Sequence, residues 1–203
     1  ELPLIEKCYA HCEKENPLRT LALDENEIKL VSGYQLLTLK SLGVAINFDE
    51  KSIADVDEII EQIKSKIEKA NAAIIPFFAK IELELSKLSD EDSAAFMSDY
   101  GISESALSKI LRTSYDLLGL HSFFTVGEDE CRAWTIKKNY NAQQAAGVIH
   151  TDFFNRFIRA EVVSYEDFIK HGSFNKCKEA GSWRLEGKEY VVKDGDILNI
   201  RHN

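Results

Sequence analysis

Two groups of side chains in this sequence have the chemistry to bind a metal ion or to transfer a proton. Cys8, His11 and Cys12 lie within one predicted helical turn, and thiolate and imidazole are ligands that zinc prefers. A zinc site needs about four ligands and no second cluster lies nearby, so these three are predicted to be ordinary helix residues. His150 precedes Asp152, but no Ser or Cys stands in an elbow-type motif. We therefore interpret His150 as a structural histidine rather than a general base, and we predict no catalytic residue and no metal site.

A phosphate-binding loop is missing from the sequence. The motif Gly-x-x-x-x-Gly-Lys-[Ser/Thr] supplies amides and a lysine for phosphates and a hydroxyl for magnesium, and no stretch of the 203 residues matches it. Phosphoryl transfer depends on those groups. We therefore expect this chain alone to hydrolyse no nucleoside triphosphate.

The first half of the chain has the pattern of an α/β protein. A helix is predicted over residues 2–15, and Asp24 with Glu27 forms a capping-box signal for a second helix that ends near Gly33. Apolar strands at residues 42–46 and 73–78 enclose a helix that is predicted to start at Ser52. Strand, helix and strand in this order are typical of a doubly wound parallel sheet.

Residues 82–119 are predicted to be helical. Ser89 signals the start of one helix, and Ser103 is predicted to open another. The second helix has an apolar stripe that we interpret as core packing; the stripe consists of Leu107, Ile110, Leu111, Leu117 and Leu118.

The last part of the chain has the order of a β-grasp, ubiquitin-like module. A hairpin is predicted from Phe123 to Ile136 around the polar turn 127–130, followed by a helix over residues 142–149 and a strand over residues 157–163. Two short strands are predicted around the Asp194-Gly195-Asp196 turn, over residues 190–193 and 196–200.

This last part closely resembles the TGS domain of the YchF family, the Obg-related ATPases. The resemblance implies an end of an inserted helical arm (1–37), the C-terminal part of a P-loop GTPase-like domain (38–119) and a TGS domain (120–203). It also implies ATP or GTP with magnesium in a full-length parent, with no tight binding to this chain, and association with the ribosome or ribosomal RNA. The matching residues are Phe124-Thr125, Gly127, Arg132-Ala133-Trp134-Thr135, Ala145-Ala146-Gly147, Ile149-His150-Thr151-Asp152-Phe153, Phe157-Ile158, Ala160-Glu161-Val162 and Asp194-Gly195-Asp196.

The same resemblance identifies Asn47-Phe48-Asp49-Glu50 as the Asn-x-x-Glu base-recognition motif, where ordinary GTPases have Asn-Lys-x-Asp. An aspartate at the fourth position accepts hydrogen bonds from guanine, whereas Glu50 is one methylene longer and adenine offers no equivalent pair of donors. Asn47 could bridge base and backbone, Phe48 could flank the base, and Ala79 is implied to supply a backbone contact. Taken alone, Asn-x-x-Glu also fits a surface loop.

The charge of the chain lies in its first part. Residues 1–119 carry 13 Lys and Arg against 22 Asp and Glu, and this difference equals the whole net charge of −9, while residues 120–203 carry 12 of each. Phosphates would repel the acidic part, so we expect the TGS module to contact the ribosome or RNA. The expected contact residues, which we take to be neighbours in the sheet, are Arg132, Lys137, Lys138, Arg156 and Arg159. The open alternative is a solvated face that pairs with Glu128, Asp129, Glu130 and Glu161.

Composition limits the remaining classes of function. No apolar run approaches the roughly 18 residues of a membrane span, so we expect no membrane partner. Four cysteines are too few for a disulfide framework, so we expect a cytoplasmic protein. We also expect no DNA specificity. The absence of a start methionine suggests a fragment or a trimmed chain. We therefore expect a fragment of a YchF-type hydrolase. The alternative is a non-catalytic TGS adaptor that binds RNA, the ribosome or a protein without nucleotide.

Overall fold

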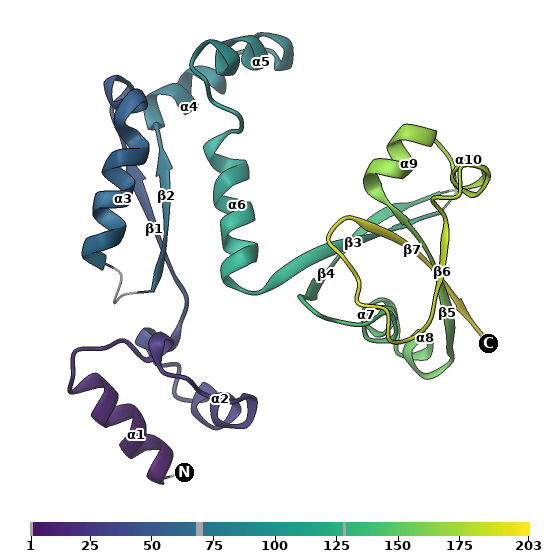
Figure 1. Ribbon diagram of the computed structural model, residues 1–203, viewed down its shortest axis with the longest axis horizontal. Coiled ribbons are helices and arrows are strands. Elements are labelled where there is room, and N and C mark those ends of the chain that lie inside the picture. Colours follow the sequence, from purple (N-terminus) through teal and green to yellow (C-terminus); the bar gives the residue numbers. More distant parts are fainter. Residues whose placement is uncertain (1, 68–70, 128) are drawn as a thin grey trace. The chain divides into compact units, whose positions relative to one another are not determined.

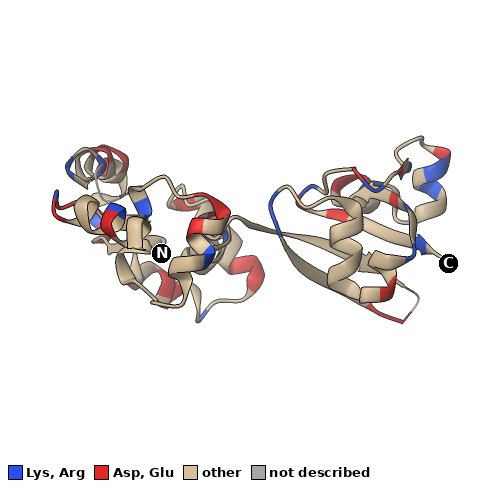
Figure 2. Cartoon of the chain, turned by 90° about the horizontal axis from the view of Figure 1, so that it is seen from below, with Lys and Arg blue, Asp and Glu red and all other residues tan. Residues whose placement is uncertain are grey.

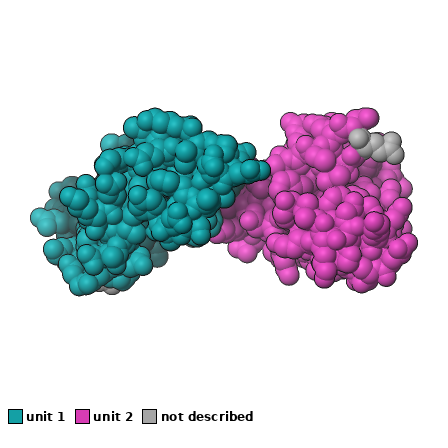
Figure 3. All heavy atoms as spheres, turned by 90° about the horizontal axis from the view of Figure 1, so that it is seen from above, with its two compact units in different colours: residues 1–118 teal, residues 119–203 magenta. Residues whose placement is uncertain are grey.

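The computed structural model describes residues 2–67, 71–127 and 129–203. It contains two compact units, residues 1–118 and residues 119–203 (Figure 3). Both units combine helices with strands, so the predicted α/β class is confirmed (Figure 1). In the described part of the chain, no helix has both the length and the apolar character needed to cross a membrane.

The first unit begins with a small helical cluster. It comprises α1 (Leu2–Cys12), η1 (Leu18–Thr20), α2 (Glu25–Ser32) and η2 (Leu37–Leu39). The Asp24 side chain accepts hydrogen bonds from the backbone of Asn26 and Glu27, and the Glu27 side chain accepts one from the Asp24 backbone. The predicted capping box is therefore confirmed. The buried residues of the cluster are Leu4, Cys8, Leu18 and Val31.

A two-stranded parallel sheet follows. Strands β1 (Leu42–Asn47) and β2 (Ala72–Phe77) are joined through η3 (Glu50–Asp55) and α3 (Val56–Ile67). The expected capping by Ser52 is wrong, because the Asp49 side chain accepts from the Lys51 backbone at 3.0 Å and starts the helical segment earlier. Register pairs Asn47 with Phe77, so the two strands end level with each other.

Three helices complete this unit, namely α4 (Ala79–Leu85), α5 (Asp90–Asp99) and α6 (Ala106–Leu117). Ser89 caps α5 as predicted. Ser105, not Ser103, caps α6, and the Glu82 carboxylate accepts a hydrogen bond of 2.7 Å from the Ala106 backbone. This contact crosses 24 positions, so local sequence could not reveal which serine starts the helix.

The expectation that the apolar stripe of α6 packs in a core is wrong for much of the stripe. Leu107, Leu111 and Leu118 are 65%, 54% and 64% exposed. The periodicity correctly identifies an apolar helix face. It cannot indicate that α6 packs on β1 and β2 through only part of that face, which leaves Leu107, Leu111 and Leu118 exposed.

The second unit is built on a mixed five-stranded sheet. Its elements are β3 (Leu120–Val126), β4 (Cys131–Lys137), α7 (Ala142–Ile149), α8 (Thr151–Asn155), β5 (Phe157–Ser164), α9 (Tyr165–His171), α10 (Phe174–Glu179), β6 (Arg184–Glu186) and β7 (Asp196–His202). The strand order is β4-β3-β7-β5-β6, and β3 is parallel to β7 while the other pairs are antiparallel.

The predicted hairpin, helix and third strand are all present, but the predicted strand at 190–193 is wrong. Val191 makes only an isolated bridge with Asn141, and the additional strand of the sheet is β6, which pairs with the free edge of β5. Of the two valines at this point, Val192 is fully buried in the core while Val191 is exposed, so only one of them serves burial. The other core residues are Phe123, Ile136, Ala142, Ala145, Ala160, Val162 and Leu198. The small side chains of α7 allow that helix to lie close to the sheet.

One carboxylate is buried in the second unit. Asp196 is 2% exposed, and its side chain accepts hydrogen bonds from the Tyr190 hydroxyl at 2.8 Å and the Lys193 backbone at 2.9 Å. An Arg184 nitrogen lies 3.6 Å from the other carboxylate oxygen. Burial, followed by the hydrogen bond to Asp196, raises the pKa of Tyr190 to about 12. A buried charge requires partners of this kind, so the cluster fixes the turn that starts β7.

Candidate functional site

The first candidate site lies where β1 and β2 end. Asn47 is the last residue of β1 and Ala79 is the first residue of α4. The Asn47 side-chain oxygen accepts a hydrogen bond from the Ala79 backbone nitrogen at 3.0 Å. The Phe48 backbone nitrogen donates to the Phe77 carbonyl oxygen at 2.9 Å. Two loops that are distant in sequence are therefore held together at this edge of the sheet.

The bond to Ala79 fixes the orientation of the Asn47 amide. A backbone N–H can only donate, so the atom facing it must be the amide oxygen. The amide nitrogen is left with two N–H donors and no hydrogen-bond partner among the described residues. Asn47 is exposed, so these donors are available to acceptors on a ligand.

Two aromatic residues flank the hydrogen-bonded pair, because Phe48 follows Asn47 and Phe78 precedes Ala79 in the sequence. The Phe48 and Phe78 ring centroids are 6.2 Å apart, with the rings tilted by 49°. Both side chains are half-buried. They supply an apolar wall at the strand ends, which suits the face of a planar heterocycle.

The carboxylate of Glu50 is paired with Lys80. The Lys80 Nζ donates to a Glu50 oxygen at 2.9 Å, and this hydrogen bond raises the pKa of Lys80. Sequence reasoning selected Glu50 but missed Lys80, which lies 30 positions away. The sequence feature that could have identified Lys80 is its position directly after Ala79. The pair lowers the capacity of Glu50 to accept hydrogen bonds from a ligand.

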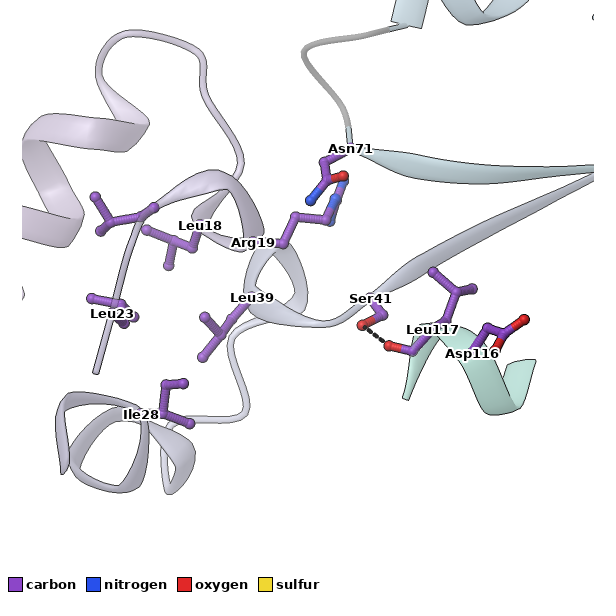
Figure 4. A pocket seen from close by; sticks show the side chains of 10 residues that line it. Leu18, Arg19, Leu23, Ile28, Leu39, Ser41, Asn71, Asp116 and Leu117 are labelled. Atoms are coloured by element: carbon purple, nitrogen blue, oxygen red, sulfur yellow. Dashed lines mark hydrogen bonds between the residues drawn. The ribbon is translucent and has the colours of Figure 1, made fainter. Parts of the chain in front are cut away.

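Two cavities of the first unit differ in how close they lie to the ends of β1 and β2. A cavity of about 390 Å³ lies near η1, η2 and the end of α6, and its lining includes Arg19, Asn71 and Leu117 (Figure 4). The Ser41 hydroxyl donates to the Leu117 carbonyl oxygen at one side of it. A second cavity of about 320 Å³ is lined by Phe77 and Phe78 and therefore adjoins the strand ends. Neither cavity has any of the predicted base-binding residues in its lining.

The predicted basic contact residues of the second unit are all exposed, but they do not form one group. Arg132 and Lys137 lie on β4 and Arg159 lies on β5, and two strands, β3 and β7, separate β4 from β5. The expectation that these segments are neighbours is therefore wrong. Lys138 follows Lys137, and Arg156 precedes β5. Acidic residues are interspersed with the basic ones (Figure 2).

Trp134 and His150 have structural contacts. The Trp134 indole nitrogen donates to the Thr125 hydroxyl at 2.9 Å, and the Arg132 guanidinium lies 4.4 Å from the centre of the indole ring. The His150 Nδ1 accepts from the Asp152 backbone at 3.2 Å and caps α8. Within the described ranges, no three His, Cys, Asp or Glu side chains gather as metal ligands.

Comparison with known proteins shows similarity along the whole chain. The family model described as "YchF-GTPase_C: Protein of unknown function (DUF933)" matches residues 120–203. Two proteins named "Ribosome-binding ATPase YchF" are similar to all of this chain. The Haemophilus ducreyi protein is 42% identical over 203 residues and the Bacillus subtilis protein is 43% identical over 205 residues. In both cases the chain covers 56% of the relative, so it spans about half the length of the curated relatives it matches.

A solved structure supports the same relationship. The Schizosaccharomyces pombe YchF GTPase superposes with a TM-score of 0.78 at 33% sequence identity. The match covers 98% of this chain and 53% of the yeast protein. The similarity therefore includes the first unit, which the family model does not cover.

Proposed function

We propose, for a chain that belongs to the YchF family, that its first unit forms the base-recognition part of a nucleotide-binding domain. Residues 38–119 would supply that part, and residues 1–37 would end an inserted helical arm. Residues 120–203 would form a TGS domain of the β-grasp type. The observation that carries the proposal is the hydrogen bond between Asn47 and Ala79, because it leaves two amide donors exposed at the ends of parallel strands. Ligands of open α/β sheets bind outside the carboxyl ends of the strands.

The geometry favours adenine over guanine. Guanine presents a ring N–H and an amino group side by side, and these require a free carboxylate. The Glu50 carboxylate is one methylene longer than aspartate and already binds Lys80. The Asn47 amino group can donate to a ring nitrogen of either base, so it supplies affinity without discrimination. We infer that ATP, with magnesium, is the nucleotide of the full-length protein, and that the groups for its phosphates lie outside this sequence.

We further propose that the second unit contacts the ribosome through its RNA. Support comes from the relatives, which are named ribosome-binding ATPases, and from the exposed arginines and lysines of this unit. The first unit is acidic, so phosphates would repel it. An adaptor that works without nucleotide is the less favoured alternative, because it leaves the outward-facing amide donors of Asn47 without a role.

Ligand-observed NMR on the chain tests the nucleotide proposal. Saturation-transfer signals from adenosine are expected to exceed those from guanosine, with weak affinity because phosphate contacts are missing. Asn47→Asp should abolish the adenosine signal, since aspartate keeps the acceptor for Ala79 but loses the amide donors. The matched control is Asn71→Asp at another exposed asparagine of the same unit, which should keep the signal. Equal saturation-transfer signals from adenosine with the parent chain and with Asn47→Asp would show that the Asn47 amide does not bind the base.

A further inference from the structure

Strands β5 and β7 place two arginines side by side at one end of the sheet of the second unit. Arg159 and Arg201 are register partners, and both are exposed. Partners on adjacent strands project from the same face of a sheet. On that face the opposite end is closed, because Val163 and its partner Ile197 are buried. The end of this face that carries Arg159 and Arg201 is therefore exposed to solvent and charged.

Only one of these two arginines is neutralised. Glu161 accepts hydrogen bonds from Arg201 at 3.1 Å and 3.2 Å, and its second oxygen also accepts from the Asn199 amide at 3.0 Å. Arg159 has no polar partner in the part of the chain that the structure describes. Arg159 therefore keeps an uncompensated guanidinium at this end of the sheet, and an anion bound there would neutralise it.

The same end of the sheet carries further cationic and aromatic groups. Arg156 lies three positions before Arg159 and donates to the Asn203 carbonyl oxygen at 3.5 Å. His202 follows Arg201, and its ring is stacked on that of Phe153 from α8, with centroids 4.3 Å apart and planes 26° apart. β7 ends here beside β5, close to α8 (Figure 1).

We propose that this C-terminal rim binds single-stranded RNA; the rim consists of Phe153, Arg156, Arg159, Arg201 and His202. Guanidinium groups bind phosphate oxygens in a bidentate manner, and Arg159 has its guanidinium available for this. Arg201, which is held by Glu161, lies beside it on the neighbouring strand. The stacked rings of Phe153 and His202 provide a platform for a base, which an acidic peptide would not use. His202 follows Arg201 on β7, so the rings and the arginine pair project from opposite faces of the sheet, and an RNA strand would cross the end of β7 to contact both. The inference rests on the proposed RNA contact of the second unit and names the residues that make it. Arg201 is new to that contact, and the rim excludes Lys137 and Lys138.

Fluorescence anisotropy with a labelled short oligouridine tests the rim on the full 203-residue chain. Arg159→Gln is expected to weaken binding at least about threefold and to reduce the slope of log K against log salt by about 0.7, as for one phosphate contact to a single strand. Because Arg159 has no polar partner, its replacement should leave the fold intact. The matched control is Lys176→Gln on α10, which removes the same charge from another exposed position and should bind as the parent does.

Three outcomes would contradict RNA binding by the rim. The parent chain could fail to bind oligouridine at low salt, or Lys176→Gln could weaken binding as much as Arg159→Gln does. The third outcome is that Lys137→Gln/Lys138→Gln weakens binding while Arg159→Gln binds as the parent does. The last outcome would leave the proposed RNA contact of the second unit in place but move it to β4. Co-sedimentation with ribosomes separates the two proposals. A parent that does not sediment contradicts ribosome contact, while the oligouridine measurement still decides the rim.

Discussion

The Asn47 side chain spans from the end of β1 to the first residue of α4, where its oxygen lies 3.0 Å from the Ala79 backbone nitrogen. The Ala79 N–H is one of the amides at the start of a helix that have no partner within the helix. The Phe78 cap residue offers no side-chain bond of its own. Asn47 therefore stabilises the start of α4 from a distance and orients its own amide donors outward.

These two roles of Asn47 can be separated by substitution. Asn47→Ala should lower the free energy of unfolding by about 0.5–1.5 kcal/mol, because the Ala79 N–H loses its acceptor. Asn47→Asp should unfold like the parent, since a carboxylate oxygen still accepts that bond. Urea denaturation measures the difference. Equal destabilisation by both variants would show that the acceptor role is not what stabilises the loop.

The Glu50–Lys80 pair should control the choice of base. Glu50→Asp is expected to raise the affinity for guanosine relative to adenosine by about tenfold, since a shorter carboxylate moves away from Lys80 and gains charge-assisted hydrogen bonds of about 1.5–3 kcal/mol. Lys80→Met is the control, because it breaks the pair but keeps the longer side chain. It should change the ratio of the two dissociation constants less. A ratio that Glu50→Asp leaves unchanged would contradict this account.

The Tyr190–Asp196 contact predicts a dependence of stability on alkaline pH. The pKa of Tyr190 is about 12 in the folded chain against an ordinary value of 10.0, so the folded state holds this proton more tightly than the unfolded state. The stabilisation is complete below pH 10.0 and is lost as the pH rises towards 12. Over that range, the free energy of unfolding of the parent should fall more steeply than that of Tyr190→Phe. Parallel curves for the two proteins would mean that Tyr190 titrates normally.

The exposed leucines of α6 are predicted to tolerate substitution by a charged residue. Leu107→Glu and Leu111→Glu should each change the free energy of unfolding by no more than about 0.5 kcal/mol, because both side chains already contact water. Ile81→Ala is the buried comparison, with Ile81 1% exposed, and should cost about 2–5 kcal/mol. Chemical denaturation measures all three. A Leu107→Glu variant as unstable as Ile81→Ala would show that this face is covered in the protein.

Local signals in the sequence predicted the local structure well. The capping box of Asp24 and Glu27, the Ser89 cap and the hairpin from β3 to β4 all depend on residues that are close in sequence. The choice between Ser103 and Ser105 depended on the distant Glu82, and it was predicted wrongly. A capping residue in the sequence marks a position where a helix can begin or end, and tertiary contacts select among such positions.

The arrangement of the charges could not be predicted in the same way. The order of the strands follows from the last strand, β7, which inserts between β3 and β5 and separates β4 from Arg159. Arg201 became a partner of Arg159 only through that insertion. For the same reason Lys80 was missed, since its contact with Glu50 depends on β1 and β2 ending level with each other.

Protein-observed NMR of the isotope-labelled chain during titration with adenosine tests base recognition most directly. We expect the Asn47 side-chain amide and the Ala79 backbone amide to shift together, with the Phe48 resonances, while resonances of the second unit stay in place. Guanosine at the same concentrations should produce smaller shifts. Adenosine shifts that spare Asn47 and Ala79, or that guanosine reproduces in full, would contradict the account.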